Sequence, residues 1–253
     1  MLRIDLQTTG LDRVIKGAEA LTEQQLKWAV ADAMSAAAKD SQENLKRVTP
    51  QYVDKPTPFT LNSIYRWPGY VKPNRLSVEV GFKDLKQKNQ GSSRHYLLPM
   101  VQGTARPATR GEQRLRSLSG FGGMYYIPAN YKNSGINFNS YGNPVAGTHT
   151  RVLSRIKAFN LQGFNMNRSK PLAAGKADYF AAVMPTAGGR KAGIYFRVGE
   201  KKRGFHTSFY LTRKAPQYKA TFPVSDILHR SFAQSYQAEL RRNITRKVNR
   251  LGL

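Results

Sequence analysis

The chain has 253 residues, of which 40% are hydrophobic and 11% aromatic, and it carries 41 Lys/Arg against 15 Asp/Glu. This length and apolar content suffice for a folded core, and the composition is not that of a disordered chain. The absence of cysteine excludes disulfides, thiol nucleophiles and thiolate metal sites. Residues 1–6 lack the apolar segment of a secretion signal, and no run of about 18 apolar residues occurs, so we expect no membrane contact.

The positive charge is concentrated in the later part of the chain. Residues 1–84 contain 12 Lys/Arg and 10 Asp/Glu, whereas residues 85–253 contain 29 and 5. Such an excess repels copies of itself and attracts polyanions, which points to nucleic acid or an acidic protein surface as the partner. We therefore expect residues before Asp84 to serve subunit packing, and cations after Asp84 to face the partner.

The N-terminal part predicts one long helix. Apolar residues alternate over residues 2–6, which indicates a strand, and a short helical stretch follows over residues 11–21. Thr22 and Gln25 have the spacing of a capping box, and apolar residues at helical spacing continue to Leu45. Pro50 is expected to end this helix.

The next segments predict mostly loops. Three prolines in residues 52–69 indicate an irregular arm, alternation over residues 76–80 indicates a strand, and residues 86–94 are polar. Residues 103–176 are rich in glycine, and only residues 151–161 have a helical pattern. This middle segment is either an insertion ordered by partners, which we favour, or a set of short strands.

Regular patterns return near the C-terminus. Residues 179–184, 193–198 and 206–212 are aromatic and β-branched and predict three strands, with residues 199–204 as a basic hairpin loop. A long amphipathic basic helix follows Pro223. We therefore expect an α+β fold, a single domain over residues 1–253, with an antiparallel sheet packed by the two long helices and residues 103–176 as a loop insertion.

The residues that catalysis needs are sparse. The four histidines have neither a His-x-x-x-His pair nor a neighbouring carboxylate, and the carboxylates after Asp84 are widely spaced. Residues 171–176 superficially resemble a phosphate-binding loop, but Lys170 and Ala177 replace the required Gly and Ser/Thr. The sequence predicts no catalytic residue, no cofactor and no metal ion.

Basic residues near the C-terminus form a candidate surface for nucleic acid. Phe196, Phe205, Tyr210 and Tyr218 interleave with them, although we favour strand core as the role of these aromatics. No base-reading module is recognisable, so any contact would be with phosphates and independent of sequence. The candidate polyanion-facing residues are Arg190, Lys191, Lys201, Lys202, Arg203, Arg213, Lys214, Arg241, Arg242, Arg246 and Lys247.

Several short motifs resemble those of a known group of proteins. They are Val48-Thr-Pro50 leading into residues 56–60, Tyr96-Leu-Leu-Pro99, Gly103-Thr-Ala-Arg106 with Glu112, Tyr126-Ile-Pro128, and Tyr141-Gly-Asn143. Together they resemble minor tail and tail-completion proteins of tailed bacteriophages, the minor tail protein Z-like group. The resemblance implies a virion component without enzymatic activity, with intersubunit loops that include Pro56, Pro58, Phe59, Tyr96, Pro99 and Arg106.

Two hypotheses follow. The first is a structural virion protein of the phage neck or upper tail, a homo-oligomer that forms or completes a ring between head and tail around the DNA path. Its neighbours would be portal, adaptor or tail proteins, with non-specific contact to genomic DNA, and it would be assembled in the host cytoplasm. The alternative is a nucleic-acid-binding protein that coats DNA through phosphate contacts; an enzyme acting on nucleic acid ranks third.

Overall fold

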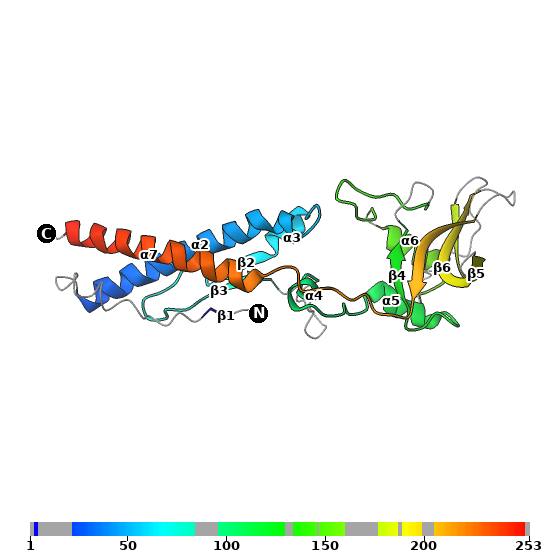
Figure 1. The fold of residues 1–253 in the computed structure, drawn as a ribbon, viewed down its shortest axis with the longest axis horizontal. Coiled ribbons are helices and arrows are strands. Elements are labelled where there is room, and N and C mark those ends of the chain that lie inside the picture. Colours follow the sequence, from blue (N-terminus) through cyan, green and yellow to red (C-terminus); the bar gives the residue numbers. More distant parts are fainter. Residues whose placement is uncertain are drawn as a thin grey trace. The chain divides into compact units, whose positions relative to one another are not determined.

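The computed structural model describes residues 3–4, 22–83, 96–129, 134–145, 147–159, 177–186, 189–198 and 205–250 (Figure 1). They belong to two compact units. Met1–Gly103 and Lys219–Leu253 form the helical unit, and Thr104–Tyr218 form the sheet unit. The sequence predicted one domain with an insertion over residues 103–176; the second unit begins at that point but continues to Tyr218 and has a core of its own.

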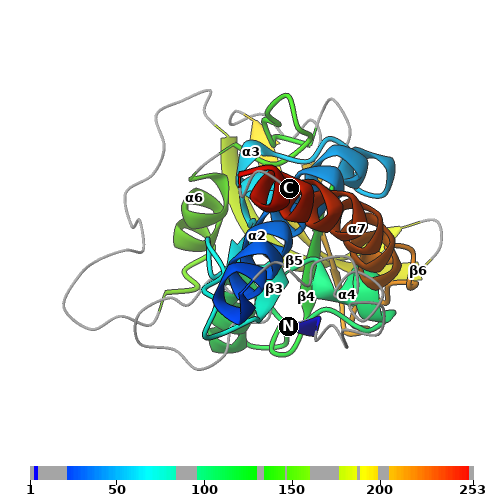
Figure 2. The ribbon, with the colours of Figure 1, turned by 90° about the vertical axis from the view of Figure 1, so that its left-hand side faces the viewer.

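Two long helices, α2 (Glu23–Val48) and α7 (Val224–Arg250), run side by side in the helical unit (Figure 2). The predicted capping box is confirmed: Thr22 Oγ1 accepts a hydrogen bond from Gln25 N, and Gln25 Oε1 accepts one from Thr22 N. The helix α2 continues to Val48, and a 3-10 turn, η1 (Thr49–Gln51), accommodates Pro50. The basic helix predicted after Pro223 is likewise confirmed.

Small side chains let these helices approach closely. The buried face of α2 is rich in alanine, including Ala33 and Ala37, and meets Leu228, Phe232 and Leu240 of α7 in one apolar core. Alanine has the highest helix propensity and leaves room for a neighbouring backbone, so the same residues favour both the helix and its packing.

A three-stranded antiparallel sheet covers part of α2. Its order is β1 (Arg3–Ile4), β3 (Val78–Phe82) and β2 (Ile64–Trp67), with Ile64 opposite Phe82. Val78 and Val80 are buried in the core with α2. Ser35 Oγ of α2 accepts a hydrogen bond of 2.8 Å from Val71 N, which attaches the segment before β3 to the helix.

The prediction of an irregular arm over residues 52–69 is wrong in part. This segment contains the helix α3 (Pro58–Asn62) and the strand β2. Thr57 caps α3 by accepting from Thr60 N, and Pro58 occupies the first helical position, where its missing N–H costs nothing. A further short helix, α4 (Leu98–Gln102), ends in Gly103 with a left-handed φ of 68°.

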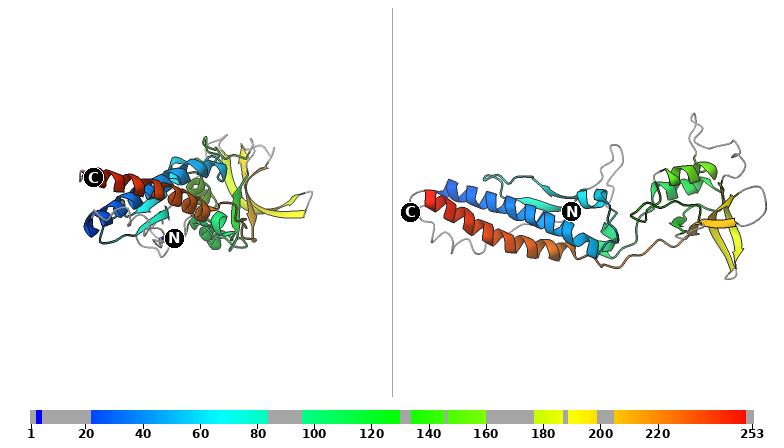
Figure 3. Two further views of the ribbon diagram at one scale, coloured as in Figure 1. Left: turned by 60° about the vertical axis from the view of Figure 1, so that its left-hand side comes forward. Right: turned by 90° about the horizontal axis from the view of Figure 1, so that it is seen from above.

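The sheet unit contains a four-stranded antiparallel sheet and short helices (Figure 3). The strand order is β4 (Tyr125–Pro128), β7 (Phe205–Thr212), β6 (Gly189–Val198) and β5 (Ala177–Thr186). The helices are α5 (Arg110–Arg114), η2 (Leu115–Ser117) and α6 (Thr148–Arg155). The three strands predicted near the C-terminus are confirmed, and β4 is an additional one.

The described parts of the glycine-rich middle segment fold within the chain itself, which corrects the preference for ordering by partners. Leu115, Val152 and Phe159 from this segment are buried against Ile194 and Phe209 of the sheet. The remaining sequence predictions for residues 11–21, 86–94, 160–176 and 199–204 lie outside the described residues. The α+β class, with long N-terminal and C-terminal helices and antiparallel sheets, is confirmed.

The sheet unit is inserted into the helical unit through two adjacent chain segments. On its own side, Arg106 N donates to Pro216 O (3.2 Å) and Tyr218 N donates to Thr104 O (3.3 Å). On the helical side, Thr221 N donates to Met100 O (3.0 Å). The chain therefore leaves each unit close to where it returns.

Candidate nucleic-acid interface

A buried carboxylate, Glu112, organises the beginning of the sheet unit. Its side chain accepts two hydrogen bonds from the Arg106 guanidinium (2.6 and 2.8 Å), two from Thr109 N and Oγ1 (2.7 and 2.9 Å), and one from Tyr126 N (3.0 Å). Burial alone would raise the pKa of the Glu112 carboxyl, but these donors outweigh it and hold the pKa below its ordinary value. Glu112 is thus ionised and neutralised inside the unit.

The sheet unit is strongly basic apart from this internal pair, which uses one cation and one anion. Residues 104–218 contain 19 Lys/Arg and 3 Asp/Glu, whereas the rest of the chain contains 22 and 12. Of the three carboxylates, Glu112 is buried with Arg106, Asp178 is exposed, and Glu200 lies outside the described residues. The helical unit thus carries a net charge of +10 and the sheet unit +16, a weaker contrast than the division at Asp84 (+2 and +24), because the basic helix α7 belongs to the helical unit.

Aromatic side chains occupy both faces of the four-stranded sheet. Tyr179, Ile194, Phe196 and Phe209 face the core with α6. The opposite face, which we name the outer face, carries four aromatics: Phe180, Tyr195, Phe205 and Tyr210. The ring of Phe180 lies 5.9 Å from that of Tyr195 and 5.2 Å from that of Phe205. The side chains of Phe205 and Tyr210 are 53% and 45% exposed.

The four aromatic residues that the sequence places among the cations are partly buried in the core and partly exposed. Phe196 is a core residue, as we favoured. Phe205, Tyr210 and Tyr218 are exposed, so strand core is the wrong interpretation for them. Alternation separates the two faces of a sheet but does not show which face is covered, so it gives no sign of this exposure.

The predicted cations fall into two groups in different units. Arg190 and Lys191 on β6 and Arg213 and Lys214 after β7 are exposed in the sheet unit. On α7 of the helical unit, Arg241, Arg242 and Arg246 are exposed and Lys247 is partly buried. Lys201, Lys202 and Arg203 lie outside the described residues. The sequence analysis missed Arg197, an exposed residue of β6 opposite Phe205, which alternation within residues 193–198 could have indicated.

The candidates for intersubunit loops also differ in exposure. Phe59 is 58% exposed and Tyr96 is 46% exposed, Pro58 is exposed, and Pro56 is partly buried. Pro99 is buried in α4. Arg106 is bound to Glu112 and its guanidinium lies 5.4 Å from the ring centre of Tyr125, so the side chain of Arg106 has an internal role.

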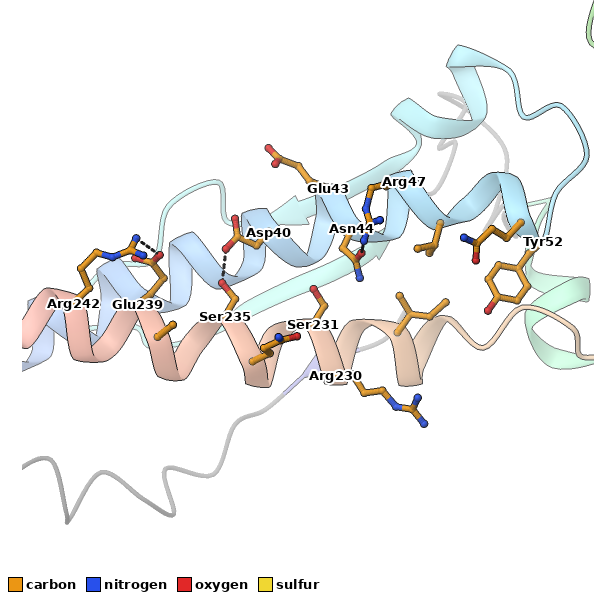
Figure 4. A pocket seen from close by; sticks show the side chains of 15 residues that line it. Asp40, Glu43, Asn44, Arg47, Tyr52, Arg230, Ser231, Ser235, Glu239 and Arg242 are labelled. Carbon is orange, nitrogen blue, oxygen red and sulfur yellow. Dashed lines mark hydrogen bonds and ion pairs between the residues drawn. The ribbon is translucent and has the colours of Figure 1, made fainter.

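An open polar groove of about 780 Å³ lies between α2 and α7 (Figure 4). Its charges are of both signs and are partly paired: Arg242 contacts Glu239 at 2.6 Å, and Asp40 accepts from Ser235 Oγ. Arg230 points away from α2. This mixture contrasts with the sheet unit and does not favour a polyanion.

His149 packs between two aromatic rings in the sheet unit, and its pKa is shifted. Its ring centre lies 5.4 Å from that of Tyr126 and 5.6 Å from that of Phe209, and burial lowers its pKa from 6.5. In the portion of the chain that the structure describes, no three His, Asp or Glu side chains gather where they could hold a metal ion. No described helix has the length and apolarity that crossing a membrane requires.

Comparisons with protein-family models, with curated proteins and with solved structures found no match for this chain.

Proposed function

We propose that this protein is a structural component of a tailed-bacteriophage virion, at the neck or upper tail, where it forms or completes a ring around the DNA path. The observation that carries the proposal is the uncompensated positive charge of the folded sheet unit, whose Glu112 is neutralised internally by Arg106. Cations spread over a surface attract phosphates without reading sequence, which suits a passage for genomic DNA. The motifs that resemble tail-completion proteins support the same role.

An unprotected sheet edge supports assembly into a homo-oligomer. In the described sheet β5 is an edge strand, paired only with β6. Its one charged residue, Asp178, and its one proline, Pro185, stand near opposite ends, so the middle of the strand has neither. Proteins usually protect such long edges with charges, prolines or bulges, because unpaired N–H and C=O groups invite another strand. The exposed residues Phe59 and Tyr96 offer further contact area for neighbouring portal, adaptor or tail proteins.

The oligomeric state of the purified chain tests the assembly. We expect negative-stain images to show closed rings, with a matching mass by light scattering. Val183→Lys places a charge on β5 and should shift the rings toward monomers. Val145→Lys is a matched control, because Val145 and Val183 are both 42% exposed and Val145 lies outside the strands.

Virions provide the second test. Mass spectrometry of purified particles should detect the chain as a constituent. A chain that stays monomeric at all concentrations and is absent from the particles would contradict the proposal.

The alternative function is a protein that coats nucleic acid. The exposure of Phe205 and Tyr210 on a basic unit favours it over an enzyme. Tight, salt-dependent binding to DNA by a monomer would support this alternative.

A further inference from the structure

We infer that the outer face of the β4-β7-β6-β5 sheet is a stacking platform for an unpaired nucleic-acid strand. This inference goes beyond the proposed ring and does not depend on it. It rests on where a β-bulge, a glycine and two cations place the four outer aromatics: Phe180, Tyr195, Phe205 and Tyr210.

The bulge brings Phe205 and Tyr210 to the same face. These residues are five apart in β7, so strict alternation would place them on opposite faces. However, Ile194 is opposite Phe209 while the next residue, Tyr195, is opposite Thr207, so Ser208 is an extra residue in β7. Ser208 is buried and donates to Ser134 O at 2.7 Å. Bulges commonly redirect side chains next to functional sites, and here the bulge adds Tyr210 to the outer face.

Gly193 lets the aromatics form a continuous apolar floor. It lies opposite Tyr210, and a Cβ atom at this position would come within 2.9 Å of the Tyr195 ring and 3.1 Å of Phe209 O. The Tyr195 ring therefore covers Gly193, with its hydroxyl donating to Lys191 O at 3.0 Å. Tyr195 in turn contacts Phe180, which contacts Phe205 edge to face. Ring contacts thus connect Phe205, Phe180 and Tyr195, and Tyr210 lies opposite the glycine that Tyr195 covers. Tyr195 is only 6% exposed, so the rings open to a ligand are those of Phe205 and Tyr210.

Cations stand at two positions on this face. Arg197 lies opposite Phe205, and Lys191 lies opposite Met184 with the same alternation; both are exposed. They are six residues apart on β6, roughly 20 Å along an extended strand. The outer face also carries one carboxylate, Asp178, opposite Arg197, and its Oδ1 accepts from Tyr179 N at 3.0 Å.

Exposed aromatic rings beside exposed cations favour an unpaired nucleic-acid strand over other polyanions. Bases in a duplex are already stacked on one another, so a duplex could use Lys191 and Arg197 but would leave the exposed rings of Phe205 and Tyr210 uncovered. Unpaired bases can stack on aromatic side chains while their phosphates contact nearby cations. The excess of 19 Lys/Arg over 3 Asp/Glu in residues 104–218 favours a polyanion over an apolar protein partner.

Fluorescence anisotropy with a labelled oligothymidylate tests the inference on the full chain. Phe205→Ala and Tyr210→Ala should each weaken binding about tenfold, the effect of losing one stacked base. Phe205→Leu, which keeps apolar bulk without a ring, should also weaken it, whereas Phe205→Trp should preserve it. Tyr141→Ala is the matched control, because Tyr141 is 38% exposed in the same unit but outside the sheet, and it should bind as the parent does.

Competition and circular dichroism complete the experiment. An unlabelled oligothymidylate should compete better than the same length of duplex or than heparin, which has no bases. Equal competition by duplex or heparin, or unchanged oligothymidylate binding by a folded Phe205→Ala/Tyr210→Ala variant, would overturn the platform. Failure to bind oligothymidylate while binding an acidic protein would overturn it as well. Ring formation is measured separately, so neither result decides the other.

Discussion

The helical unit and the sheet unit are stabilised in different ways. In the helical unit, α2 and α7 are joined by an apolar core in which Ala33 and Ala37 meet leucine and phenylalanine. In the sheet unit, an apolar core coexists with a buried ion pair between Glu112 and Arg106. We therefore expect the loss of one exposed charge to cost the helical unit little, and the loss of Glu112 to cost the sheet unit much more.

The two units also differ in the charges on their surfaces. Acidic and basic residues both line the groove between α2 and α7. In the sheet unit Glu112 is buried with Arg106, whereas the exposed described cations include Arg190, Lys191, Arg197, Arg213 and Lys214. The Glu112–Arg106 pair uses one anion and one cation, so the positive excess that attracts polyanions to this unit is unchanged by it.

The largest expected effect separates the two units. Glu112→Ala leaves the partly buried Arg106 guanidinium and the Thr109 and Tyr126 donors without their acceptor, and we expect it to destabilise the sheet unit by about 3–5 kcal/mol. Limited proteolysis should then cut within residues 104–218. The two tryptophans, Trp28 and Trp67, both belong to the helical unit, and their fluorescence should stay native.

Glu43→Ala is the control for this experiment, because Glu43 is an exposed residue with a long 3.9 Å contact to Lys39. It should change the unfolding of either unit by only a few tenths of a kcal/mol. Joint loss of tryptophan fluorescence and of protease resistance in Glu112→Ala would mean that the units do not unfold separately.

A smaller effect is expected in the helical unit. Ser35→Ala leaves the buried Val71 N–H without its acceptor, which should cost about 1–3 kcal/mol in urea unfolding followed by tryptophan fluorescence. Ser41→Ala is the matched variant, since Ser41 is buried on the same helix but bonds only to Ala37 O. Equal costs for the two substitutions would show that the hydrogen bond to Val71 is not what stabilises this position.

The smallest expected effect is a dependence of stability on pH, and it concerns the sheet unit. Burial lowers the pKa of His149 in the folded state, so the unfolded chain binds the proton more readily. The stability that comes from burying His149 in its neutral form is therefore fully present above the ordinary pKa of 6.5. It is lost as the pH falls through the lower pKa of His149 in the folded state. His149→Phe should flatten this dependence in thermal unfolding of the sheet unit, and the same slope in parent and variant would refute it.

The sequence predicted the helical unit better than the sheet unit, for a physical reason. The capping box at Thr22 and the alanine-rich face of α2 are local signals that agree with the final packing. The three prolines of residues 52–69 favour an irregular arm and obscure the helix α3, although Thr57 followed by Pro58 is also a typical helix start.

The sheet unit depends on contacts between distant residues. The strand β4 is held by pairing with β7, more than 80 residues away along the chain. Glu112 is linked to this strand by the hydrogen bond from Tyr126 N, which the local sequence around Glu112 does not indicate. The exposure of Phe205 and Tyr210 depends on the bulge at Ser208, which has no local signature. Among the candidate residues, the exposed cations could thus be listed from sequence, while the aromatic face they flank could not.

The chain enters and leaves the sheet unit through neighbouring segments, so residues 104–218 can be removed or exchanged as one piece. Gly103 and Ala220 are near neighbours, since a Cβ on Gly103 would lie 3.2 Å from the Ala220 Cβ, and Thr104 bonds to Tyr218. A deletion that joins Gly103 to Lys219 should therefore spare α2 and α7, and residues 104–218 should be transferable as a cassette. Joining a different segment at these two junctions would replace the basic module while the helical framework is kept.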